Sequence, residues 1–216
     1  MNNPFLQIIK HRCFITVIWI VLFISGSICS ANNNLNYMNE TDSIRKAVDA
    51  CITDSCKVSV LSKVFWQHEN NDFEHAKYYG EWIYNEFKNS KNYYTLWQVS
   101  YIKGEILRIE EKFDSAYFFY AMALDISEKA GHKFRLAPVY FYLGEVNDAI
   151  GNHDDAINCM KTSLALFEKE KKWNDAHWAA RKVAEMYARS AQYDSAEAYY
   201  SKRLALTKKT PDKTEL

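Results

Sequence analysis

The hydrophobic positions of the chain recur at helical spacing. Between residues 135 and 150 the apolar stripe is formed by Val139, Tyr140, Leu143, Val146 and Ile150. These intervals of three and four place the side chains on one face of a helix. Gly151 and Asn152 then interrupt the pattern, and a second stripe follows at Ala156, Met160, Leu164 and Phe167. The pattern predicts two helices, with Gly151 as the left-handed terminator of the first.

The same two-helix plan recurs at 92–130 and 173–209, and less clearly at 57–90. The start of each second helix shows the period, because the letters F-E-H-A at 73, F-D-S-A at 113, H-D-D-A at 153 and Y-D-S-A at 193 follow one another at intervals of 40 residues. A period of this size predicts stacked helix pairs that bury their apolar faces against one another. We expect eight repeat helices, with breaks near residues 71, 91, 111, 131, 151, 171 and 191.

Small residues occupy equivalent places in these units. Gly104, Gly144 and Ala184 recur on the first helices, and Ala76, Ala116, Ala156 and Ala196 recur on the second helices. Helices can approach closely only where side chains are small, so we expect close packing at these positions. Strand-type alternation is scarce, and the chain of 216 residues contains only three prolines and six glycines. The sequence therefore predicts an all-α fold.

These residues resemble the tetratricopeptide repeat (TPR). Leu143-Gly144-Glu145, followed by Gly151 through Ala156, matches its Leu-Gly and Gly-x-aromatic-x-x-Ala signals, with Tyr187 and Pro211 as its later aromatic residue and closing proline. The period exceeds the usual length of about 34 residues and is similar to the longer repeats of kinesin light chains and of bacterial sensor and regulator proteins. The resemblance implies a right-handed TPR-like α-solenoid of stacked antiparallel helix pairs, whose first helices line a concave groove for a protein or peptide partner.

The N-terminus is typical of a secretory signal. Lys10 and Arg12 precede an apolar run at 13–24, and small residues at 25–31 suit a signal peptidase that cleaves after Ala31. An uncleaved anchor is the alternative, although the run is shorter than the roughly 20 residues that span a bilayer. A lipid anchor at Cys29 is a second alternative. We expect an exported protein on the periplasmic or extracellular side of a bacterial envelope, with no membrane span in the mature chain.

The expected organisation has four parts. Residues 1–31 form a signal peptide, 32–56 a polar segment with a capping helix, 57–209 the four-repeat TPR-like domain, and 210–216 a C-terminal tail. The capping helix is predicted over 41–50, with Thr41 or Asp42 as its N-cap.

Cysteine usage is compatible with export. Cys51 and Cys56 bracket a Thr-Asp-Ser turn, and a disulfide between them could close that turn in an oxidising compartment. Free buried thiols are the alternative. Metal binding is disfavoured, because no second cysteine pair or suitably spaced histidine accompanies them. Cys159 is expected to pack as a small core residue.

Motifs for catalysis are absent from the sequence. There is no glycine-rich phosphate loop, no H-E-x-x-H and no G-x-S-x-G. With 27 basic and 27 acidic residues the formal charge is zero, so no basic excess attracts nucleic acid. We expect no catalytic residue, no metal, no cofactor and no nucleic-acid partner.

One set of residues is a candidate for partner binding. Glu105, Glu145 and Glu185 recur at the repeat interval on the first helices, and Tyr101, Phe141 and Arg181 stand four residues earlier. Stacked units would align them as a ladder of carboxylates beside aromatic rings. The alternative is that the carboxylates are solvated or paired within their own helices, Glu105 with Arg108, and Glu185 with Arg181 and Arg189.

Two functions from different classes are compatible with this pattern. The first is an exported, non-enzymatic adaptor that binds a protein or peptide in the groove. The second is the extracytoplasmic sensory module of a bacterial signalling protein, because long TPR arrays form that part of some histidine kinases and transcription regulators. Because the given sequence ends at Leu216, soon after the repeats, a sensory module would be a stand-alone or a truncated relative of such a signalling protein.

Overall fold

The computed structural model describes residues 40–131 and 136–209, and the expected signal peptide and C-terminal tail lie outside them. The chain divides into two compact units, Met1–Ala50 and Cys51–Leu216. Of the first unit, residues 40–50 are described, and residues 40–49 are helical. Residue 40 already belongs to this helix, so the expectation that Thr41 or Asp42 forms its N-cap is wrong.

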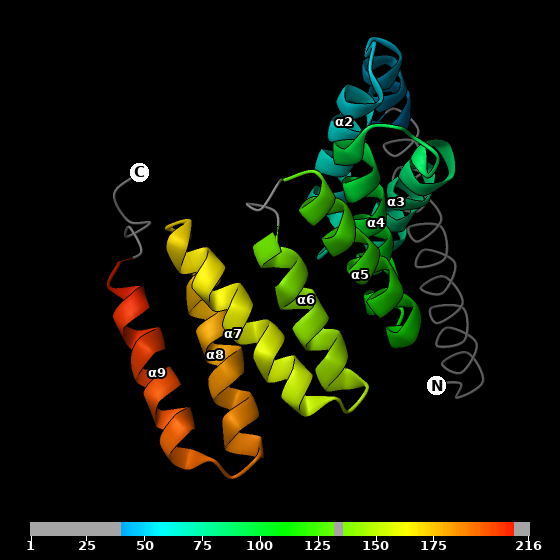
Figure 1. The fold of residues 1–216 in the computed structure, drawn as a ribbon. Coiled ribbons are helices and arrows are strands. Elements are labelled where there is room, and N and C mark those ends of the chain that lie inside the picture. The colour runs from blue at the N-terminus through cyan, green and yellow to red at the C-terminus, as the bar shows by residue number, and fades with distance from the viewer. Residues whose placement is uncertain (1–39, 132–135, 210–216) are drawn as a thin grey trace, which may run out of the picture. The chain divides into compact units, whose positions relative to one another are not determined.

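The second unit contains eight helices within the described residues (Figure 1). They are α2 (Asp54–His68), α3 (Phe73–Phe87), α4 (Tyr93–Ile109), α5 (Phe113–Lys129), α6 (Leu136–Ala149), α7 (His153–Lys169), α8 (Trp173–Arg189) and α9 (Tyr193–Thr207). All seven predicted breaks fall between these helices, and the described residues contain no strand. The eight-helix prediction is confirmed, and α2 begins at Asp54 where the repeats were expected from 57.

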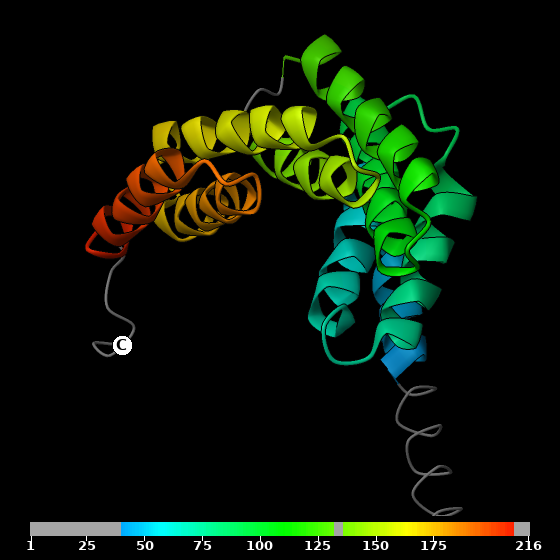
Figure 2. The ribbon, with the colours of Figure 1, turned by 90° about the horizontal axis from the view of Figure 1, so that it is seen from below.

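Consecutive helices pack as neighbours. The most extensive contacts lie within the pairs α4–α5, α6–α7 and α8–α9, while α7 also packs on α8 and α5 on α6. Figures 1 and 2 both show α6 beside α7 and α8 beside α9. The core follows the same order, because apolar layers join α4 to α5 and α6, and then α6 and α7 to α8 and α9.

Small residues lie where the paired helices meet, as the sequence predicts. A methyl group added at Gly144 of α6 would lie 2.9 Å from Met160 Cγ and 3.2 Å from the backbone oxygen of Ala156, both in α7. Ala156 and Ala184 are themselves fully buried. At these positions the backbone of one helix therefore packs against side chains of its partner helix.

Four of the turns between helices share one geometry. Each contains a residue with positive φ, namely Glu111 (58°), Gly151 (88°), Lys171 (57°) or Ala191 (57°). The next residue donates its N–H to the carbonyl five positions earlier, as in Asn152 to Asn147 at 2.8 Å. This is the Schellman arrangement, which satisfies carbonyls at the end of the helix. Gly151 is the left-handed terminator that the sequence predicts.

A disulfide joins the segment before α2 to the first turn of that helix. Cys51 and Cys56 are joined, with their Cα atoms 5.6 Å apart. Between them, Thr53 is the N-cap of α2, and its side-chain oxygen accepts a hydrogen bond from the Cys56 N–H at 3.3 Å. Cys159 is a half-buried free thiol. Among the described residues, no helix is long and apolar enough to cross a membrane.

Candidate functional site

Helices α4, α6 and α8 are the first helices of three successive repeats, and their side chains line two hollows. We call the larger one the charged groove. It has a volume of about 570 Å³ and is lined by Arg108, Phe113, Glu145, Asp148, Ala149, Lys182, Glu185, Met186, Ala188, Arg189 and Tyr200. The smaller one, the aromatic pocket, has a volume of about 380 Å³ and is lined by Tyr101, Pro138, Phe141, Tyr142, Phe167, Lys172, Asp175 and Trp178.

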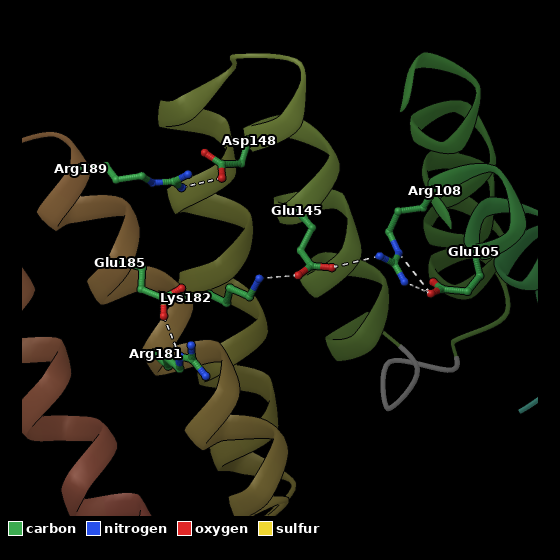
Figure 3. A network of polar contacts seen from close by, with 8 residues as sticks. All are labelled: Glu105, Arg108, Glu145, Asp148, Arg181, Lys182, Glu185 and Arg189. Carbon is green, nitrogen blue, oxygen red and sulfur yellow. Dashed lines mark hydrogen bonds and ion pairs between the residues drawn. The ribbon is translucent and has the colours of Figure 1, made fainter. Parts of the chain in front are cut away.

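The charged groove is bridged by ion pairs between neighbouring first helices (Figure 3). Glu145 of α6 accepts from Lys182 of α8 at 2.7 Å and lies 3.8 Å from Arg108 of α4. Within α8, Arg181 donates to Glu185 at 2.6 Å. Glu145 therefore lies between cations from both adjacent repeats and links three helices through one carboxylate.

A second bridge joins the ends of α6 and α8. Asp148 accepts from Arg189 at 2.5 Å and contacts His153 at 3.0 Å. Partial burial raises the pKa of Asp148, but the bonds from Arg189 and His153 outweigh it and hold the pKa below its usual value. Asp148 therefore remains an anion in the groove well into the acid range.

At the α4 end, the network continues into the protein. Glu105 is fully buried and accepts from the Tyr120 hydroxyl at 2.5 Å and from Arg108 Nε at 3.1 Å. A second carboxyl group of this region is that of Glu69, the C-cap residue of α2. Burial, followed by the interaction with the Glu105 carboxyl group, raises the pKa of Glu69 to about 8 against the opposing charge of Arg108.

The aromatic pocket is bordered by rings from α4, α6, α7 and α8. Tyr101 of α4 is buried, Phe141 and Tyr142 of α6 are half-buried, and Trp178 of α8 is 49% exposed. The ring centroids of Tyr101 and Tyr142 lie 5.9 Å apart, and those of Phe141 and Tyr142 lie 5.4 Å apart. Such a surface can bind an apolar or aromatic side chain.

Guanidinium groups connect the two hollows. Arg108 lies 5.0 Å from the Tyr142 ring centroid, and Arg181 lies 5.3 Å from that of Trp178. Both arginines are also bound to carboxylates of the network, Glu105 and Glu185. Because α6 contributes Phe141 to the pocket and Glu145 to the groove one turn later, the two hollows follow each other along one face of the first helices.

The structure divides the six residues that the sequence selected. Glu145 and Glu185 line the charged groove, Tyr101 and Phe141 line the aromatic pocket, and Arg181 lies beside both through its contacts with Trp178 and Glu185. Glu105 does not belong to an exposed carboxylate ladder, because α5 covers it and Tyr120 binds it. The ladder prediction is wrong for this residue, which cannot contact a partner directly.

The expected pairing within helices is confirmed in two of three cases. Arg108 binds Glu105, and Arg181 binds Glu185. Arg189 instead reaches across to Asp148 of the preceding repeat. Sequence reasoning also missed Trp178 and Lys182, although Trp178 lies three residues before Arg181, a spacing that places both on one helix face.

Two histidines outside this face, His68 and His75, are in contact with each other. His68 ends α2 and His75 follows the start of α3, so they belong to different helices as expected. Their ring centroids nevertheless lie 4.4 Å apart, and His75 also contacts Tyr79 at 5.1 Å. These contacts place the two imidazoles in an aromatic cluster between the helices of the first pair.

No protein-family model and no curated protein matches the sequence. Solved structures do match the fold. BtubC (BKLC) from P. vanneervenii has a TM-score of 0.69 and 15% identity over 84% of this chain and 74% of that chain. A Rap protein complexed with Competence and Sporulation Factor has a TM-score of 0.68 and 17% identity over 82% of this chain and 51% of that one.

A third similar structure is a signal transduction ATPase (STAND) protein with a tetratricopeptide repeat sensor, from Pyrococcus horikoshii. It has a TM-score of 0.64 and 16% identity over 80% of this chain and 27% of that chain. The chain therefore spans about half of the Rap protein and about a quarter of the STAND protein. The eight repeat helices among the described residues, their 40-residue period and these likenesses give one conclusion: the chain has the all-helical fold of tetratricopeptide-repeat proteins.

Proposed function

We propose that this protein is an exported, non-enzymatic adaptor that binds an extended segment of a protein or peptide partner along α4, α6 and α8. The observation that carries the proposal is the succession of the aromatic pocket and the charged groove on one helix face. An extended segment could place an apolar side chain in the pocket and polar or charged groups in the groove. A few well-packed side chains supply most of the binding energy of such interfaces, so the apolar side chain in the pocket would contribute most.

The chemistry of the hollows suits recognition. The groove presents guanidinium and ammonium donors beside carboxylate acceptors, so a charged partner can exchange one ion pair for another at small net cost. The aromatic rings add apolar contact area that is already rigid. The Rap protein solved with Competence and Sporulation Factor supports the proposal, because it shows a bound factor on a protein of this fold.

Export rests on two features of the chain. The N-terminal sequence has the basic start, apolar run and small residues of a secretory signal. The Cys51–Cys56 disulfide suits an oxidising compartment such as the periplasm. Fusing residues 1–40 to a reporter enzyme that is active only outside the cytoplasm tests this part, since a silent fusion would contradict export.

Partner capture tests the binding face. The purified chain serves as bait for extract of the compartment in which it accumulates, and each captured protein is then measured with Trp178→Ala and Phe141→Ala variants. We expect at least a tenfold loss of capture in both, because each substitution removes a ring from the aromatic pocket.

A matched control lies on α5. Phe118 is an exposed aromatic side chain, at 59%, that lines neither hollow. Phe118→Ala should therefore leave capture unchanged, and circular dichroism should show that all three variants remain helical. A partner that tolerates both pocket substitutions but is lost with Phe118→Ala would place the binding face on the second helices.

A sensory module is the second candidate function. It is favoured by the likeness to a STAND protein whose repeats are described as a sensor. In that case the same face would bind a signal, and binding would change the state of an output domain. A captured partner that carries a kinase or DNA-binding domain would favour this function over a simple adaptor.

A further inference from the structure

The aromatic pocket contains a carboxylate among its rings. The carboxylate belongs to Asp175, which lies three residues before Trp178 on α8, so both side chains reach the same face of that helix. The residues of the pocket that carry aromatic rings are Tyr101, Phe141, Tyr142, Phe167 and Trp178. A site of about 380 Å³ that combines several rings with one acid suits a group that is both apolar and positively charged.

The charge of Asp175 is not balanced within the pocket. Two charged residues line the pocket, Lys172 and Asp175. Lys172 is bound to Glu170 at 2.7 Å, so its charge is already matched. Asp175 forms no ion pair with any cation in the part of the chain that the structure describes. Partial burial raises the pKa of its carboxyl group, and the charge of Lys172 offsets this effect only in part. A cation that enters the pocket would therefore meet an unmatched carboxylate.

Rings of the pocket already bind guanidinium groups of the protein itself. Arg181 lies 5.3 Å from the ring centroid of Trp178, and Arg108 lies 5.0 Å from that of Tyr142. Each of these arginines also binds a carboxylate of its own helix. The combination of cation, ring and carboxylate thus occurs twice beside the pocket. The pocket supplies rings and the Asp175 carboxylate in the same combination, and the partner would supply the cation.

We propose that the aromatic pocket binds a basic side chain of the partner, preferably arginine, and that Asp175 determines this preference. The aliphatic stem of the side chain packs against the rings, and its charged end lies at Asp175. A guanidinium group suits the pocket better than an ammonium group, because it is planar, stacks on rings and is more weakly hydrated. The inference rests on the proposed function, since it names the residue type with which the partner enters the pocket.

Three blocked pentapeptides test the pocket without any partner. They carry a central arginine, leucine or glutamate between glycines, and binding is followed by the NMR signal of the Trp178 indole N–H, assigned by its absence in Trp178→Phe. We expect the arginine peptide to bind about fivefold or more tightly than the leucine peptide, and the glutamate peptide to bind most weakly. Equal or tighter binding of the leucine peptide would overturn the proposal, as would an unshifted signal with the arginine peptide at about 50 mM.

An amide in place of the carboxylate tests the role of Asp175. In Asp175→Asn the preference for arginine over leucine should fall to about twofold or less, while the leucine peptide still binds. Asp155→Asn is the matched control, because Asp155 is the third residue of α7, as Asp175 is of α8, and it lines neither hollow. The preference should be unchanged in this control. An unchanged preference in Asp175→Asn would contradict the proposal.

The comparison of the three peptides on the wild-type protein does not depend on the folding of any variant. It also separates this inference from the proposed function. Tighter binding of the leucine peptide would reject a basic side chain in the pocket, whereas the adaptor function is tested by partner capture with Trp178→Ala and Phe141→Ala.

Discussion

At Gly104 the backbone of α4 meets the ring of Tyr120 from α5. A methyl group added there would lie 2.9 Å from two ring carbons. The ring cannot easily move away, because its hydroxyl is bound to the buried Glu105 carboxylate. The absence of a side chain at Gly104 therefore permits both the close helix contact and the hydrogen bond from Tyr120 to the buried Glu105 side chain.

Gly104 and Gly144 occupy equivalent positions in successive repeats. Alanine substitutions there should show whether the neighbouring side chain can move aside. We expect Gly104→Ala to lower the free energy of unfolding by about 1–3 kcal/mol, because the Tyr120 ring is held in place. Gly144→Ala should cost less than Gly104→Ala, because the flexible Met160 side chain can adjust and only the Ala156 backbone oxygen, at 3.2 Å, is fixed. Urea unfolding of both variants measures the difference. Equal costs would contradict the expected difference between the two sites.

Three turns between helices show how a helix ends where the sequence has no glycine at the left-handed position. Glu111, Lys171 and Ala191 adopt the same left-handed backbone as Gly151. A side chain in this conformation costs roughly 1–2 kcal/mol, yet the Schellman hydrogen bonds are present at each site. The packing of the helices on either side of each turn therefore offsets the free-energy cost of the left-handed conformation.

Glycine should stabilise two of these turns. Lys171 and Ala191 are exposed, and we expect Lys171→Gly and Ala191→Gly each to raise the free energy of unfolding by about 0.5–1 kcal/mol, once the greater freedom of glycine in the unfolded chain is subtracted. Gly151→Ala should have the opposite effect. Thermal melts of the three variants test the prediction, and a lower melting temperature for either glycine variant would contradict it.

Element boundaries were predictable because their signals are local. Gly151 and the repeated acid-alanine motif mark breaks that need no knowledge of the fold. The burial of Glu105 was not predictable from its position in the repeat. It depends on Tyr120, which lies 15 residues away on another helix. Arg189 could not be assigned to Asp148 either, because the two are 41 residues apart in sequence and a local partner, Glu185, was available.

Across the whole molecule, equal numbers of acidic and basic residues leave no net charge near neutral pH. General repulsion between charges should then be small, and a few specific groups should dominate the pH dependence of stability. Two of them act in opposite directions. The pKa of Glu69 is raised on folding, so its contribution is lost as pH rises, whereas the pKa of Asp148 is lowered, so its contribution is lost in acid.

Stability should therefore decrease from weakly acidic to weakly alkaline pH. The contribution of Glu69 is complete below 4.5, its ordinary pKa, and disappears as pH rises through about 8. After allowance for the half-exposed position of Glu69, we expect a loss of about 1–2 kcal/mol between pH 5 and pH 9. Urea unfolding at a series of pH values measures it, and Glu69→Gln should flatten the profile. A wild-type profile that is already flat would refute the assignment.

The three glutamates at equivalent positions of successive repeats show what duplication copies and what it leaves open. Their side chains are 0%, 22% and 36% exposed at Glu105, Glu145 and Glu185. Each repeat has a glutamate at the same position of its first helix, but the residues around that glutamate differ from repeat to repeat. Selection would therefore hold the first glutamate fixed as part of the interior while the third is free to vary. New binding specificity in this array would arise most easily at its C-terminal repeats, where a changed residue alters the surface and leaves the core intact.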